Sequence, residues 1–350
     1  MAKADVKGKA EADEGILPSQ AIRALIREGE VKLAEPLLAN QLQPASLDLR
    51  LGTVAYRVRA SFLPGKGEKV STKLDELQLH AISLSQGAVL ETGCVYVAPL
   101  LESLDLPADL CAATNPKSST GRLDVFTRVI ADGVSAFDQI PPGYSGQLYA
   151  EICPQTFPIV VRKGSRLSQI RFRRGGTEPK PVQDIPLSVD LSGGEDGLVG
   201  YRAKRHTGLV DVDAVGARAM IDYWEPIHVR EKKRLILDPD QFYILASKEA
   251  VHVPPDQAAE MVPFNPLVGE FRVHYAGFFD PGFGDEEAGG AGSRAVLEVR
   301  SHKVPFILED GQIIGRLVYE RLTDKPELLY GRDLSSHYQA QGLKLSKHFK

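Results

Sequence analysis

The sequence has 350 residues, of which 43% are hydrophobic and 25% charged, as in an ordinary protein of one or two globular domains. A net charge of −4 gives no global attraction for long nucleic acid or an anionic membrane, and no apolar run approaches the roughly 18 residues that span a bilayer. The three cysteines are well separated and form no CxxC motif, so we expect a cytoplasmic protein without disulfides.

The chain begins with a polar stretch, residues 1–14, that lacks an apolar signal core and is expected to be a disordered leader. A helix is predicted next, over residues 18–30, with Ser19 placed to cap its first turn and Gly29 placed to end it. Helical patterns are scarce in the rest of the chain.

Most other segments are typical of β-strands. Polar and apolar residues alternate in QPASLDLRLG (residues 43–52), which predicts a half-buried strand with Asp48 on its polar face. Short β-branched and aromatic runs follow, separated by turns that contain Pro and Gly. The expected fold is therefore mainly β, a barrel or jelly roll with few short helices.

The segment NPKSSTGRLDVF (residues 115–126) is the first candidate site. Lys117 and Arg122 supply positive charge for phosphate oxygens, and the hydroxyls of Ser118 and Ser119 add donors. The order of these residues is not that of a Walker loop. An ordinary polar surface loop is the alternative interpretation.

Glu151 is the second candidate. In the strand pattern GQLYAEI it precedes the apolar Ile152, and partial burial there would raise the pKa of its carboxyl and suit it to proton transfer. An exposed strand glutamate is the alternative. Further polar positions occur at Arg166, Ser168 and Gln169 in SRLSQIRF. The segments 200–208 and 337–346 are either lids over a ligand or solvated tails.

The sequence resembles itself at a shift of 147 residues. Residues 90–110 align with residues 237–257, and residues 150–172 align with residues 297–319. Two blocks that share one offset indicate two copies of one domain.

The copies differ in one turn, because residues 140–146 match residues 279–284 at a shift of about 139. The alignment places Glu298 opposite Glu151. We expect a first domain over residues 15–213 and a degenerate second domain, with a C-terminal tail, over residues 214–350.

Several motifs together resemble the bacterial dCTP deaminases, in a long, internally duplicated form that is related to the trimeric dUTPases. The resemblance rests on QPASLDLRLG, LESLDLPADL, KSSTGR, PPGYSGQLYAEI and SRLSQIRF, in that order. It implies two tandem dUTPase-like distorted β-barrel domains, a homotrimer with active sites at subunit interfaces, and dCTP as substrate. It also implies Mg²⁺ carried on the triphosphate, and dTTP as a feedback inhibitor.

The resemblance assigns roles to single residues. Lys117, Ser118 and Arg122 match the family's phosphate loop, which also helps to position the reacting water, although Lys117 replaces an arginine and loses its fork of donors. Glu151 matches the glutamate that shuttles protons during hydrolytic deamination of dCTP to dUTP and ammonia. Ser118 and Arg122 would orient the water and keep the carboxyl ionised before reaction.

The closing C-terminal segment of the family is matched by Tyr201 in the first copy, and by Tyr338 and Gln341 in the second. The zinc deaminases use an H-x-E motif and a P-C-x-x-C motif, and this sequence has neither pair of metal ligands in that spacing. We therefore expect no protein-bound zinc.

The first copy departs from the family at residues 139–142, where the family usually has an aspartate that contacts the sugar of the substrate. That aspartate is retained in the second copy as Asp280, and Asp132 or Asp138 of the first copy could substitute for it. The second copy, at residues 262–271, lacks the hydroxyl pair and the arginine of the phosphate loop.

Two arrangements of the site follow. Either the first copy is complete and uses Glu151, or a composite site joins its loop to Asp280 and Glu298 of the second copy. A three-fold ring cannot alternate two kinds of domain, so the expected trimer favours Glu151, and a two-fold arrangement would favour the composite.

Two other functions stay open. A bifunctional enzyme, or a dUTP diphosphatase, would cleave a phosphoanhydride to give dUMP, with Asp48 helping to orient a metal-positioned water. A non-catalytic module would bind pyrimidine nucleotides and regulate a partner, but binding alone does not require a poised carboxylate.

Overall fold

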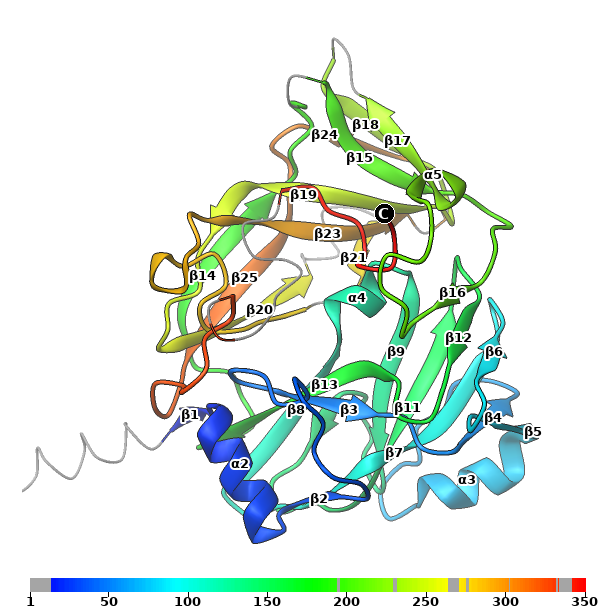
Figure 1. Cartoon of the computed structure of the whole chain (residues 1–350), viewed down its shortest axis with the longest axis vertical. Coiled ribbons are helices and arrows are strands. Elements are labelled where there is room, and N and C mark those ends of the chain that lie inside the picture. Colours follow the sequence, from blue (N-terminus) through cyan, green and yellow to red (C-terminus); the bar gives the residue numbers. More distant parts are fainter. Residues whose placement is uncertain are drawn as a thin grey trace, which may run out of the picture.

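The computed structural model describes residues 14–193, 196–228, 232–263, 271–274, 277–301, 303–331, 333 and 342–350. It confirms a mainly β protein with a few short helices (Figure 1). The expected leader lies outside the described residues except for Glu14. Among the described helices, none is both long enough and apolar enough to span a membrane.

The N-terminal half comprises strands β1 to β13, and the later strand β16 pairs with β12. One sheet runs β1-β13-β8-β10 with β3 also on β13, a second runs β5-β4-β7-β11-β9 with β2 also on β7, and a third runs β16-β12-β6. The bounds are β1 (Gly15–Ile16), α2 (Ser19–Glu28), β2 (Val31–Leu33), β3 (Leu47–Arg50), β4 (Val54–Val58), α3 (Val70–Leu77), β5 (Gln78–Ser83), β6 (Ala88–Leu90), β7 (Val95–Asp105), β8 (Leu110–Pro116), α4 (Ser118–Gly121), β9 (Val125–Ala131), β10 (Gln139–Ile140), β11 (Ser145–Pro154), β12 (Ile159–Val161), β13 (Arg166–Arg174) and β16 (Val210–Asp211).

The C-terminal half contains the sheets β14-β25-β20-β22, β17-β15-β19-β23-β21 and β18-β24. Strands β14 and β15 therefore pair with later strands, although the sequence-based division at residue 213 assigned them to the first domain. The bounds are β14 (Pro181–Ser188), β15 (Leu198–Ala203), α5 (Met220–Tyr223), β17 (Trp224–His228), β18 (Arg234–Leu237), β19 (Phe242–Val251), β20 (Gln257–Pro263), β21 (Phe271–His274), β22 (Phe278–Phe279), the 3-10 helix η2 (Glu286–Ala288), β23 (Ser293–Ser301), β24 (Phe306–Glu309) and β25 (Ile313–Arg321).

Strand pairs recur at the spacing found in the sequence. In the pair β7–β11 Glu151 lies opposite Val97, and in the pair β19–β23 Glu298 lies opposite Ile244. A tyrosine contact also recurs, because the Tyr96 hydroxyl accepts from the backbone N–H of Glu91 at 3.1 Å and the Tyr243 hydroxyl from that of Asp238 at 2.9 Å. Glu151 and Glu298 thus occupy matching strand positions.

The helix predicted over residues 18–30 is α2, and Gly29 ends it with φ of 79° in the left-handed region that glycine tolerates. Ser19 does not cap it. The N-cap position belongs to Pro18, and Ser19 is the first helical residue, so the side chain expected to cap lies inside the first turn.

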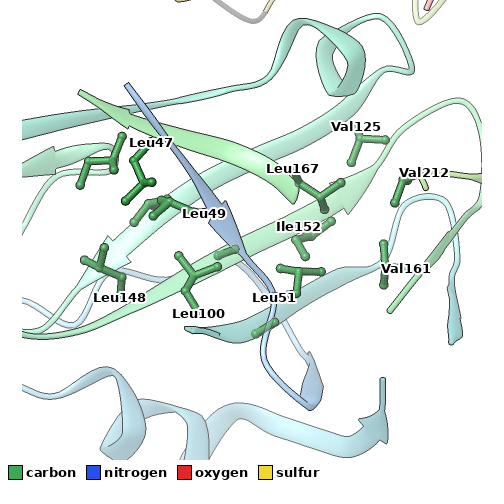
Figure 2. Packing of buried hydrophobic residues seen from close by; sticks show 14 of the residues in the cluster. Leu47, Leu49, Leu51, Leu100, Val125, Leu148, Ile152, Val161, Leu167 and Val212 are labelled. Carbon is green, nitrogen blue, oxygen red and sulfur yellow. The ribbon is translucent and has the colours of Figure 1, made fainter. Parts of the chain in front are cut away.

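The core of the N-terminal half lies between its sheets. Figure 2 shows Leu47 and Leu49 of β3 gathered with Leu100 of β7 and with Leu148 and Ile152 of β11. All five side chains are buried. A second core cluster fills the C-terminal half.

Strand β3 is buried on both faces rather than on one, which corrects the half-buried strand expected from its alternation. The buried Arg50 guanidinium donates from Nε to Glu102 Oε1 at 2.7 Å, and its other nitrogens donate to backbone carbonyls. Buried charges require partners of this kind. The polar face of β3 therefore faces other protein groups, and Asp48 is hydrogen-bonded to Lys117.

Buried ion pairs join the two halves. Arg173 of β13 donates from Nη2 to Glu320 Oε1 at 2.6 Å and from Nε to Oε2 at 2.9 Å, and these two residues are 147 positions apart. Arg171 donates to the backbone oxygens of Ala259 at 3.0 Å and Phe279 at 3.2 Å. The sheets that contain β13 and β25 are thus held together through matching strands.

Replacing Glu320 with Ala should destabilise the protein by about 3–5 kcal/mol, because the Arg173 guanidinium would stay buried without its carboxylate. The denaturant midpoint of the variant measures this loss. Glu327→Ala is the matched control, since the Arg23–Glu327 pair is exposed and should contribute at most about 1 kcal/mol. Equal losses in both variants would contradict a stabilising junction at Arg173.

Candidate active site

A pocket lies between the two halves, and both halves line it. Side chains come from β3, the segment around α4 and β13 on one side, and from β22, the turn after it and β23 on the other. The lining residues are Asn40, Gln43, Asp48, Pro116, Lys117, Ser118, Ser119, Arg122, Arg166, Gln169, Met261, Gly277, Phe278, Phe279, Asp280, Phe283, Val296, Glu298, Tyr330 and Lys347. This lining is that of the composite arrangement.

The segment KSSTGR forms one helical turn at the pocket wall. The backbone N–H groups of Thr120 and Gly121 donate to Lys117 O at 2.8 and 3.0 Å, so the chain turns sharply after Lys117. Its end is fixed by the C-terminal segment, where Arg122 Nη1 donates to Lys344 O at 3.0 Å and Ser346 Oγ donates to Ser119 O at 2.8 Å. The C-terminal segment therefore holds the end of the loop that the sequence predicts to bind phosphate.

Positive side chains gather at one part of the pocket. The Lys117 ammonium is hydrogen-bonded to Asp48 Oδ2, and Arg166 Nη1 lies 3.3 Å from the same oxygen. Lys347 also lines the pocket, and burial together with Lys117 and Arg166 lowers the pKa of its ammonium. A cluster of three cations around a single carboxylate favours binding of a further anion.

Glu298 of β23 is a buried carboxyl that faces Arg122 of the loop. Its side chain is 6% exposed, and its Oε1 lies 4.0 Å from Arg122 Nε. Burial raises the pKa of Glu298 to about 8, and the Arg122 guanidinium opposes that rise. A carboxyl with a pKa close to neutral pH can both accept and donate a proton during a reaction.

Asp280 follows β22 and also lines the pocket. Its Oδ1 lies 3.5 Å from Nη2 of the buried Arg171, and burial raises the pKa of its carboxyl while Arg171 lowers it. Arg171 also packs over the Phe278 ring, 4.1 Å from its centroid. The turn that contains Asp280, the aspartate typical of the family, is thus held against β13 of the other half.

Glu151 does not line this pocket. Its Oε1 accepts from Arg128 Nη2 at 2.6 Å and from Arg128 Nε at 3.2 Å. The Arg128 guanidinium lies over the rings of Phe126 and Phe137, at 4.6 and 3.5 Å from their centroids. Within one chain, Glu151 therefore lies outside the pocket that Ser118 and Arg122 line, and their meeting between subunits stays a prediction.

The two candidate substitutes for the sugar-side aspartate hold local structure instead. Asp132 Oδ1 accepts from the backbone N–H of Val70 at 2.7 Å. Asp138 Oδ1 accepts from Thr114 Oγ1 at 2.6 Å and from Val129 N at 2.8 Å, and burial raises the pKa of its carboxyl to about 6. Neither residue lines the pocket.

Of the remaining predicted positions, one lines the pocket, one does not, and two lie outside the described residues. Gln169 lines the pocket as expected. Tyr201 lies on β15, packs against the first core cluster and does not line the pocket, and burial raises the pKa of its hydroxyl. Tyr338 and Gln341 lie outside the described residues, so their role stays a prediction.

Sequence reasoning missed Lys347, and it assigned no role to Arg166. Arg166 was noted as a polar position of SRLSQIRF, and it lines the pocket, but one basic residue in a strand does not predict a specific role. Lys347 reaches the pocket only because the C-terminal segment returns to the N-terminal half, where Ser346 Oγ donates to Ser119 O at 2.8 Å. No local pattern predicts that return.

The donor set of the pocket suits a cation carried by the ligand better than one held in a protein cage. In the described part of the chain, no three or more His, Cys, Asp or Glu side chains are grouped closely enough to hold a metal ion. The pocket cations named above would instead meet phosphate oxygens.

Comparisons with known proteins decide the family. Residues 13–176 match the N-terminal domain model of 2'-deoxycytidine 5'-triphosphate deaminase, and residues 174–349 match its C-terminal domain model. The chain belongs to the dCTP deaminase family of enzymes. The two models meet at residues 174–176, ahead of β14 and β15, which pair with later strands, whereas β16 pairs with β12.

Solved and curated relatives agree with that assignment. A crystal structure of 2'-deoxycytidine 5'-triphosphate deaminase from Agrobacterium tumefaciens superposes with a TM-score of 0.85 at 61% identity, over 89% of this chain and 99% of that one. A dCTP deaminase of Natronomonas pharaonis is 30% identical over 200 residues. These residues are 55% of the present chain and 95% of the relative. A Parafrankia protein called "dCTP deaminase, dUMP-forming" is 32% identical over 191 residues, or 54% of this chain and 91% of the relative.

Proposed function

We propose that the chain hydrolyses dCTP to dUTP and ammonia in the pocket between its halves, with Glu298 as the group that moves protons. The observation that carries this proposal is a buried carboxyl with a pKa of about 8, placed 4.0 Å from Arg122 beside the hydroxyl and cation loop. The family and the relatives support the substrate. The geometry of the pocket supports Glu298 over Glu151.

The reaction replaces the amino group at C4 of the pyrimidine by an oxygen from water. Ionised Glu298 takes a proton as the water oxygen bonds to C4, and passes that proton to N3. It then carries the second proton from the new hydroxyl to the amino group, the C4–N bond breaks, and ammonia leaves with the carbonyl formed. General acid–base catalysis of this kind contributes about 10²–10⁴-fold, and positioning supplies more.

The other pocket residues would position substrate and water. Ser118 and Arg122 lie where they can orient the attacking water, and Arg122 favours the ionised form of Glu298. Lys117, Arg166 and Lys347 would hold the triphosphate, and Asp280 would accept from the sugar hydroxyl. Bound to phosphate oxygens, Mg²⁺ would neutralise part of the triphosphate charge.

The proposed step uses no protein-bound zinc. The two motifs that supply zinc ligands in the zinc deaminases are missing from the sequence. A carboxyl whose pKa lies near neutral pH gives an alternative way to activate water.

A second candidate is a bifunctional enzyme that carries dCTP through to dUMP. Relatives with the words "dUMP-forming" in their names favour it, as does the carboxylate of Asp48 among the phosphate-binding cations. Trimeric assembly and inhibition by dTTP, both expected from the resemblance, stay predictions.

Product analysis separates these functions. Purified protein incubated with dCTP and Mg²⁺ should release ammonia and dUTP in equal amounts, without pyrophosphate, as followed by an ammonia assay and chromatography of the nucleotides. Equal release of ammonia, dUMP and pyrophosphate would replace the proposal by the bifunctional one. Calorimetric binding of dCTP with no product would identify a nucleotide-sensing module.

A further inference from the structure

Strand β23 presents two charged side chains to the phosphate loop of the other half. Glu298 and Arg300 are two residues apart, so they extend from the same face of the strand. Glu298 lies near Arg122, and Arg300 pairs with Asp124, which is two residues beyond Arg122. Strand β23 therefore makes two charge contacts with the end of the loop. In the first the strand supplies the carboxylate, and in the second it supplies the guanidinium.

The contact between Arg300 and Asp124 belongs to a cluster of three side chains, the third being Thr156. Arg300 Nη2 donates to Asp124 Oδ2 and to Thr156 Oγ1, the latter at 3.0 Å. Thr156 Oγ1 in turn donates to Asp124 Oδ2 at 2.5 Å. Nη1 of Arg300 donates to Asp240 O at 2.8 Å, which fixes the guanidinium from the C-terminal half as well.

The backbone around Asp124 is fixed too. Asp124 has φ of 56°, in the left-handed region that residues other than glycine seldom adopt. Its N–H donates to Gly121 O at 2.9 Å, and its carbonyl accepts from Gln155 N at 2.9 Å. The Asp124 side chain is 1% exposed and that of Arg300 is 16% exposed, so the ion pair is shielded from water and dissolved salt.

The arginine of this cluster occurs in only one of the two repeats, the one that contains Glu298. In the repeat, Cys153 stands 147 residues before Arg300, and a thiol at that position cannot form a guanidinium–carboxylate pair. The clamp thus accompanies the carboxyl that reaches the loop and is missing beside Glu151.

We propose that Arg300, Asp124 and Thr156 form a positioning clamp that sets the separation between Arg122 and Glu298 across the two halves. This inference rests on the proposed function, because it assigns the clamp to the geometry of that proton-transfer site. Arg300 is a positioning residue that acts through the loop, at a distance of two residues from Glu298 along the strand. Without the clamp, the loop and β23 would separate, and Arg122 would stabilise the ionised form of Glu298 less, since charge attraction falls with distance.

Arg300→Gln tests the clamp through activity and its pH profile. We expect kcat for dCTP deamination to fall about 10–100-fold, because small displacements of reacting groups have effects of that size. KM should change much less, since the phosphate-binding side chains remain. The rising limb of kcat against pH should move to higher pH by about one unit, which is the loss of roughly a tenfold preference for the ionised form. Arg300→Lys, which keeps the charge, should recover part of both effects.

The matched control is Arg294→Gln, a change on the same strand whose arginine pairs with Asp190 and does not line the pocket. It should leave kcat and the pH profile unchanged. If Arg300→Gln keeps wild-type kcat per folded enzyme and the wild-type pH profile while Glu298→Gln is inactive, the clamp is refuted and the proposed function stands. If Glu298→Gln is active, the proposed function itself fails.

Discussion

Glu298→Gln should lower kcat for ammonia release from dCTP by about 10²–10⁴-fold, because glutamine has the shape of glutamate but cannot carry a proton. Glu151→Gln should keep activity close to wild type, since Glu151 is engaged with Arg128 and does not line the pocket. Steady-state assays of both variants with dCTP and Mg²⁺ measure the difference. Activity retained by Glu298→Gln and lost by Glu151→Gln would return the site to the first copy.

Thermal unfolding provides the control for that comparison. The pKa of Glu298 is raised from 4.5 to about 8 in the folded protein, so the folded state keeps its proton where the unfolded state loses it. The contribution of this carboxyl to stability therefore falls as pH rises from about 4.5 to 8. Glutamine has no such penalty, and Glu298→Gln should unfold at the same or higher temperature than wild type, with a difference that grows over this range.

Arg122→Gln should lower kcat/KM about 10²–10³-fold, an effect typical of removing a charged donor from a preorganised site. In the wild type, kcat/KM should rise with pH and level off above about 8, because ionised Glu298 takes the proton from water. Arg122 lowers the pKa of Glu298, so its removal should move the rising limb to higher pH. Measuring kcat/KM between pH 6 and about 9.5 tests both statements.

Arg128→Gln is the control for that profile. Arg128 pairs with Glu151 in the first half as Arg122 faces Glu298 across the halves, but it lies outside the pocket. The rising limb should stay in place in this variant. A shift caused by Arg128→Gln, together with no shift caused by Arg122→Gln, would contradict the assignment of Glu298.

The strands and the matching positions of the two glutamates could be predicted because they depend on local pattern and on a constant offset. The choice between those glutamates could not. Both occupy the same register on equivalent strands, so no local pattern distinguishes them. What separates them is a tertiary contact, Arg128 in one case and the loop with Arg122 in the other.

The argument from a three-fold ring favoured Glu151 because an odd number of domains cannot alternate between two kinds. The structure instead packs the two halves of one chain against each other, with Arg173 and Glu320 as partners. The loop residues and Gln169 were found because their types suit phosphate or amide contacts within a short segment. Lys347 was missed, and Arg166 was noted without a role, because their place in the pocket depends on segments brought together from distant parts of the sequence.

Mixed assemblies test most directly whether one chain builds the site from both of its halves. Arg122→Gln and Glu298→Gln chains that carry different tags would be co-expressed. If the chains associate, the mixed assembly is purified through both tags, and if they do not, the separate chains are mixed. Ammonia release from dCTP is then assayed. A site within one chain leaves every site with one defect, so activity should stay at the level of the two variants. Recovery of a substantial fraction of wild-type activity would show that the loop of one chain works with the carboxyl of another, and would contradict the account.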